Sequence, residues 1–153
     1  QFKDFVINAF EKYLSFIMVG MHVEGFQWGD FCIDTWDVNE DRYDYSMNNK
    51  SDATKKYLQM LTDNSIEFKY SGLCKCNNWK RFVDIMMDCL YDNVAPYSFL
   101  FYVPMADFYF YLHNSNSLGI FYENKNEELL QFITYIKSLN WEVTFTNDEF
   151  FNE

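Results

Sequence analysis

The chain has 153 residues, of which 49% are hydrophobic and 22% aromatic, and its formal net charge at pH 7 is −11. This length is typical of one domain, and the negative charge argues against direct binding of nucleic acid, because the protein would repel the phosphate backbone. The longest apolar run, residues 99–112, contains Pro104 and Asp107 and is shorter than the roughly 20 residues that a membrane-spanning helix needs, so we expect no membrane partner.

Hydrophobic spacing divides the chain into helices and strands. In the first 18 residues the apolar side chains recur every three or four positions, which predicts an amphipathic helix that stops near Gly20. Ser51, Asn78 and Asn126 each precede a helical pattern, and Ser and Asn are favoured N-cap residues. In chain order, we expect helices over 2–18, 52–63, 79–90 and 127–139, and strands over 23–28, 31–36, 66–70, 98–103, 106–113, 119–122 and 141–146.

This order of elements predicts an α+β fold. Neither an internal repeat nor a low-complexity linker divides the sequence, so we expect residues 1–153 to form a single α+β domain. A helix with one apolar side must pack that side on another element, and a sheet is the expected support. The prediction is therefore an antiparallel or mixed β-sheet packed with about four helices.

The cysteines do not form a metal-binding or disulfide pattern. Cys74 and Cys76 are too close in sequence to bridge each other easily, and no second pair at CxxC-type spacing is present for zinc. Charged residues interrupt the apolar positions of the first helix, which is unlike a secretory signal. With Cys32 and Cys89, these cysteines are expected to be free thiols in a cytoplasmic protein that holds no metal and no cofactor.

The sequence contains none of the common catalytic motifs. Gly-rich phosphate loops, G-x-S-x-G and H-E-x-x-H are all absent, and His22 and His113 each stand at the end of an expected strand. Asp84 and Asp88 lie one helical turn apart, a spacing that brings carboxylates together for acid/base chemistry but is more often a solvated face. We do not predict an enzyme. A small enzyme or ligand-binding domain that uses Asp84 and Asp88, or His113, stays open as an alternative.

Charge is distributed unevenly along the chain. The net charge is −6 over residues 1–49, +4 over residues 50–81, which hold three acidic and seven basic residues, and −9 over residues 82–153. Six acidic residues fall within 15 positions and are opposed only by Arg42, while two Trp and two Tyr residues are interspersed among them. The predicted partner-binding residues are Trp28, Asp30, Asp34, Trp36, Asp37, Glu40, Asp41, Tyr43, Asp44 and Tyr45.

This acidic-aromatic segment predicts a binding surface for a basic protein. Carboxylates steer a cationic partner toward the surface, and buried Trp and Tyr side chains supply most of the binding energy. The hypothesis requires that the carboxylates around Trp36 be exposed and unpaired within the chain. The alternative is an acidic loop between core strands whose tryptophans point inward.

In size, charge and composition, the whole chain resembles the toxin-immunity proteins of bacterial contact-dependent growth inhibition and polymorphic-toxin systems. The resemblance implies a cytoplasmic inhibitor that neutralises a cognate, nucleic-acid-cleaving toxin by covering its active-site cleft. No motif accompanies it, so it assigns no role to individual residues. Phage-encoded inhibitors of nuclease defence, such as anti-CRISPR proteins, share this character and are the second possibility. The sequence leaves the oligomeric state open.

Overall fold

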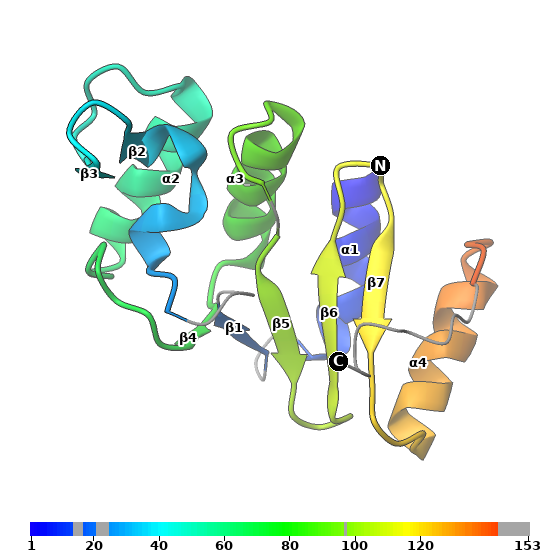
Figure 1. The fold of residues 1–153 in the computed structure, drawn as a ribbon. Coiled ribbons are helices and arrows are strands. Elements are labelled where there is room, and N and C mark those ends of the chain that lie inside the picture. The colour runs from blue at the N-terminus through cyan, green and yellow to red at the C-terminus, as the bar shows by residue number, and fades with distance from the viewer. Residues whose placement is uncertain (14–16, 21–24, 97, 144–153) are drawn as a thin grey trace.

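The computed structural model describes residues 1–13, 17–20, 25–96 and 98–143 (Figure 1). Within these residues, the α-helices are α1 (Phe2–Phe10), α2 (Asp52–Asp63), α3 (Trp79–Tyr91) and α4 (Glu127–Ser138). The strands are β1 (Met18–Gly20), β2 (Trp36–Asp37), β3 (Arg42–Tyr43), β4 (Cys74–Lys75), β5 (Leu100–Val103), β6 (Phe108–Leu112) and β7 (Leu118–Phe121). Short 3-10 helices are η1 (Glu11–Tyr13), η2 (Trp28–Phe31) and η3 (Ile33–Thr35).

The described strands form a five-stranded sheet and a separate hairpin. The sheet has the order β4-β1-β5-β6-β7, and each neighbouring pair in it is antiparallel. The hairpin consists of β2 and β3. The predicted α+β class with about four helices is therefore confirmed, and of the two sheet types expected, the antiparallel one is found.

One face of the sheet carries the core. Phe101 on β5 is opposite Phe110 on β6, and both side chains are fully buried, whereas their neighbours Tyr102 and Tyr109 pair on the other, more exposed face. This alternation follows from the two-residue period of a strand.

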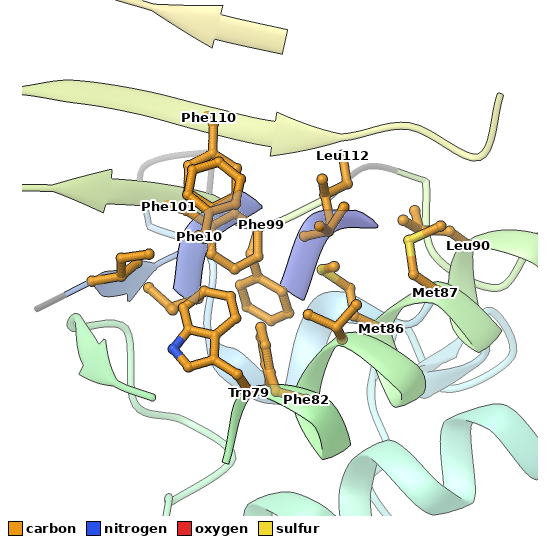
Figure 2. Packing of buried hydrophobic residues seen from close by; sticks show 14 of the residues in the cluster. Phe10, Trp79, Phe82, Met86, Met87, Leu90, Phe99, Phe101, Phe110 and Leu112 are labelled. Atoms are coloured by element: carbon orange, nitrogen blue, oxygen red, sulfur yellow. The ribbon is translucent and has the colours of Figure 1, made fainter. Parts of the chain in front are cut away.

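Helices α1 and α3 contribute side chains to this same buried face (Figure 2), and so does α4. The ring of Phe10 on α1 stacks on Phe110 with 3.8 Å between centroids, and Trp79 on α3 lies 5.5 Å from Phe101. Phe132 on α4 lies 5.1 Å from the ring of Phe108. Helix α2 packs on α3, farther from the sheet, so the fold has a sheet, a helical layer, and an outlying end that contains α2 and the hairpin (Figure 1).

The three predicted N-caps are confirmed. The side chains of Ser51, Asn78 and Asn126 accept hydrogen bonds from the backbone N–H of the third residue of α2, α3 and α4, at 3.1, 3.2 and 2.8 Å. Each bond satisfies one of the amide groups that a helix start leaves without an intrahelical partner. These helices accordingly begin at the residue that the sequence predicts.

The first helix is shorter than predicted. It ends at Phe10, with a 3-10 turn to Tyr13, and Met18–Gly20 is strand β1 rather than helix. Here Val19 is opposite Phe101 in the sheet, and a Cβ atom on Gly20 would lie 2.5 Å from the side chain of Leu73. These contacts with residues distant in sequence override the local helical spacing. Residues 14–16, in the middle of the predicted helix, lie outside the described residues.

The strand predictions for 23–28 and 31–36 are wrong over most of their described residues. Trp28–Phe31 and Ile33–Thr35 are 3-10 helices. The amides of Trp28 and Gly29 donate to the carbonyls of Tyr70 and Phe68, and that of Ile33 donates to the carbonyl of Val94, rather than to a neighbouring strand. Gly29 is needed there, since a Cβ atom would lie 2.5 Å from the ring of Tyr45. Residues 21–24 lie outside the described part of the chain.

Two further strand predictions are not supported. Residues 66–70 form a turn that accepts the amides of η2, and strand β4 comes a few residues later. Trp141 stacks on Phe5 with 3.8 Å between centroids, and residues 141–143 form no strand. The rest of the predicted strand, residues 144–146, lies outside the described residues.

Candidate protein-binding site on the β2–β3 hairpin

The structure brings the ten predicted residues into one region and divides them into two sets. We call the first set the root of the hairpin: Trp28, Asp30, Asp34, Asp44 and Tyr45. The second set, together with Val38, is the tip: Trp36, Asp37, Val38, Glu40, Asp41 and Tyr43. The two sets meet where the rings of Tyr43 and Tyr45 stack with centroids 6.1 Å apart.

The hairpin itself is closed by one short turn. Trp36 is opposite Tyr43 and Asp37 is opposite Arg42. The Asp37 Oδ1 atom accepts hydrogen bonds from the backbone amides of Asn39 and Glu40, at 2.9 and 3.2 Å. Such a side-chain to backbone bond is a common way for Asp to begin a turn. Asp37 therefore shapes the tip.

Trp28 of the root belongs to the core. Only 2% of its surface is exposed, its ring stacks on Phe99 with 4.7 Å between centroids, and its Nε1–H donates to the Gly72 carbonyl at 2.8 Å. A buried indole with its N–H paired stabilises the domain interior, so the proposed partner surface leaves Trp28 out.

Asp30 is also used inside the protein. It is 8% exposed, its Oδ1 accepts the Tyr45 hydroxyl at 2.6 Å, and its Oδ2 accepts the Gln27 amide at 3.2 Å. Burial, and then the bond to Asp30, raise the pKa of Tyr45 far above its ordinary value, which keeps its hydroxyl protonated as a donor. The pair ties the end of the hairpin to η2.

Asp34 joins the hairpin to the start of α2. Its carboxylate accepts the Ser51 amide at 2.9 Å and the Thr54 hydroxyl at 2.5 Å. A negative charge at a helix N-terminus is favourable, because the amide dipoles there point toward it. Asp34 is partly buried and committed to these partners.

Asp44 fixes the segment that leaves the hairpin. Its carboxylate accepts the Ser46 amide and hydroxyl, both at 2.9 Å, and lies 3.5 Å from the largely buried Lys50 ammonium. Its backbone amide donates to Thr35 at 2.7 Å. The bond from the Ser46 amide is the main reason why the pKa of Asp44 lies below its usual range.

The tip presents apolar and acidic groups to solvent. Val38 is 77% exposed, Trp36 40% and Tyr43 37%, and the rings of Trp36 and Tyr43 meet edge to face at 4.9 Å. Glu40 and Asp41 are exposed, and within the described part of the chain their side chains have neither a hydrogen bond nor an ion pair. The requirement for free carboxylates is met by these two residues but not by Asp30 and Asp34.

Sequence reasoning missed the exposed aliphatic residues at this site. Val38 at the tip, and Ile33 and Met47 on either side of the hairpin, are all exposed. No sequence signal marks them, because an isolated apolar residue in a polar segment is as often buried as exposed.

Asp84 and Asp88, the carboxylates of the alternative site, form ion pairs with lysines. The Lys3 ammonium lies 3.2 Å from Asp88 and 3.6 Å from Asp84, and Lys56 lies 3.6 Å from Asp88. His113 follows β6, where its ring meets Tyr111 edge to face at 4.7 Å. None of the ion pairs described for the two carboxylates includes His113. The alternative of a small enzyme stays a prediction without a supporting geometry.

No three His, Cys, Asp or Glu side chains among the described residues are grouped as metal ligands. His22 lies outside the described residues. All four cysteines are free thiols. None of the described helices has the length and apolarity to cross a bilayer.

Comparisons with protein-family models, with curated proteins and with solved structures give no match to this chain. The features that bear on function are therefore the geometry of the tip and the charge of the chain.

Proposed function

We propose that the chain is an inhibitor that binds a basic protein through the tip, and that this partner is a nucleic-acid-cleaving toxin whose active-site cleft the tip covers. The observation that supports the proposal is the exposure of Trp36, Val38 and Tyr43 beside the unpaired carboxylates of Glu40 and Asp41. Aromatic side chains that become buried on binding provide affinity, while the carboxylates attract a cationic surface and orient it.

The root makes the tip a favourable binding element. Asp34 holds one strand of the hairpin to α2, and the Tyr45 hydroxyl holds the other to Asp30. A surface that is already ordered loses less conformational entropy when it binds. The tip is therefore expected to dock with little rearrangement.

The choice of a nuclease as partner follows from charge. Enzymes that cleave nucleic acid bind phosphates in clefts rich in Lys and Arg, and a protein with a net charge of −11 is attracted to such a cleft at long range. The resemblance to bacterial immunity proteins points the same way. The free thiols fit action in a reducing compartment such as the cytoplasm.

The test uses the protein encoded directly upstream of this chain as the candidate toxin. Its binding and its nuclease activity are measured with the wild-type chain, with Glu40→Lys/Asp41→Lys, and with Trp36→Ala. The matched control is Glu123→Lys/Glu142→Lys, which makes the same change in net charge at two exposed residues outside the hairpin.

We expect each tip variant to raise the dissociation constant at least about tenfold, which corresponds to roughly 1.4 kcal/mol, and to release the nuclease from inhibition. The control variant should stay within about twofold of the wild type. Binding of Glu40→Lys/Asp41→Lys with unchanged affinity would show that the tip is not the partner surface.

A further inference from the structure

A cationic groove lies next to the tip. It is formed by α2, α3 and the segment that follows the hairpin, and it has a volume of about 510 Å³. Its lining residues combine three cations with a short apolar floor: Met47, Lys55, Lys56, Gln59, Arg81 and Ile85.

Each cation of the groove forms an ion pair at the protein surface. Lys55 pairs with Asp52 at 3.7 Å, and Lys56 pairs with Asp88 at 3.6 Å. The Arg81–Asp63 pair is shorter, at 2.6 Å. Exposed ion pairs of this kind contribute little to stability, and their charged groups exchange partners readily, because solvent screens them. The side chains of Lys55 and Lys56 are 45% and 62% exposed, so either ammonium can exchange its present carboxylate for another anion.

The tip and the groove border each other. Met47 lines the groove, and Tyr45, two residues earlier, stacks on Tyr43 of the tip. Asp34 binds Thr54 in the first turn of α2, next to Lys55. In Figure 1, β2, β3 and α2 lie together at the end of the protein opposite α4. One end of the molecule thus carries both the acidic tip and a groove whose three cations each pair with a surface carboxylate.

We infer that two copies of this chain pair through this end, each placing its tip in the groove of the other. A two-fold interface uses the same patch on both copies, so the patch must be complementary to itself. The adjoining tip and groove meet this condition. Glu40 and Asp41 of one copy face Lys55 and Lys56 of the other, and Val38 and Trp36 have apolar counterparts in Met47 and Ile85.

Pairing of this kind covers the tip. The second copy and the toxin of the proposed function then compete for the same residues, so the paired form is a reservoir that dissociates when the partner binds. The pairing itself does not depend on the identity of that partner. The competition does rest on the proposed function.

The experiment exchanges charges between the two halves of the patch and measures mass by sedimentation velocity. In Glu40→Lys/Asp41→Lys, a basic tip meets a basic groove, and in Lys55→Glu/Lys56→Glu, an acidic tip meets an acidic groove. Each variant alone is expected to be a monomer. Mixed in equal amounts, they should form a dimer, because both of the tip–groove contacts between unlike copies are then attractive.

The wild-type chain should dimerise as its concentration rises, and salt raised from about 0.05 M to about 0.5 M should shift it toward monomer. In a mixture of Lys55→Glu/Lys56→Glu with Glu123→Lys/Glu142→Lys, the second variant keeps the wild-type patch and should dimerise with itself alone. The first variant should stay monomeric, since its acidic groove repels the acidic tip of the second. If Lys55→Glu/Lys56→Glu does not fold, Lys55→Gln/Lys56→Gln takes its place, because it removes the charge of the two groove lysines without reversing it. The dissociation constant of its dimer should then be at least about tenfold higher than that of the wild-type dimer.

Two results would overturn the pairing: a wild-type chain that stays monomeric at about millimolar concentration, or a mixture of the charge-exchanged variants no heavier than either alone. Lys55→Glu/Lys56→Glu keeps an intact tip, so it should still bind the upstream-encoded protein. A monomeric wild type that inhibits that protein refutes only the pairing. A dimeric wild type that does not inhibit it refutes only the proposed function.

Discussion

The root and the tip of the hairpin are built from the same kinds of residue and use them in opposite ways. In the root, Asp30 and Asp34 accept hydrogen bonds from Tyr45, Ser51 and Thr54 and hold the hairpin in place. In the tip, Glu40 and Asp41 face solvent. The difference is one of available donors: a carboxylate becomes structural where amides and hydroxyls converge on it, and it remains available to a partner where they do not.

The largest expected difference in stability lies between the alanine variants of Trp28, in the root, and Trp36, in the tip. Trp28→Ala empties a site in the core and leaves the Gly72 carbonyl without its donor, so we expect a loss of about 3–5 kcal/mol in the free energy of unfolding. Trp36→Ala should cost less than about 1 kcal/mol, because the ring is partly solvated. Urea unfolding followed by circular dichroism measures both. Equal losses would contradict the division into root and tip.

A smaller difference in stability is expected between the alanine variants of Asp34, in the root, and Glu40, in the tip. Asp34→Ala removes the acceptor for the Ser51 amide and the Thr54 hydroxyl, and should lower the free energy of unfolding by about 1.5–3 kcal/mol. Glu40→Ala is the matched variant in the tip, and a change within about 0.5 kcal/mol is expected. If thermal and urea unfolding show the two variants to be equally stable, Asp34 does not anchor the hairpin.

The smallest effect concerns pH. The pKa of Asp44 is lowered in the folded protein, chiefly by the Ser46 amide, so the charged carboxylate stabilises the fold above its ordinary pKa near 3.8. That contribution is lost as the pH falls through the lower, folded-state pKa. The wild type should therefore exceed Asp44→Asn in stability at pH 7, with the gap shrinking below about pH 4. A gap that stays constant down to pH 2 would argue against this role of Asp44.

The sequence predicted the helices better than the strands. The caps at Ser51, Asn78 and Asn126 act within one helical turn, so local sequence is enough to identify them. The strand at Val19 and the 3-10 turns around Gly29 depend instead on Phe101 and Tyr45, which are distant along the chain, and no local pattern encodes those contacts.

The position of the candidate site was predictable in outline, but its division was not. The density of Asp and Glu marks residues 28–45, yet the burial of Asp30 is decided by Tyr45, and that of Asp34 by the start of α2. The exposure of Val38 follows from the turn that Asp37 closes. The first two outcomes need contacts between residues distant along the chain, whereas the turn at Val38 is local.

The central claim is that the tip contacts the partner while the root holds it in place. The most direct test is to record backbone amide signals of the isotope-labelled chain by NMR while the upstream-encoded protein is added. Signals of residues 36–43 should shift or broaden first, while those of residues 28–34 change little. Changes centred on Asp84, Asp88 or His113, with the tip unaffected, would contradict it.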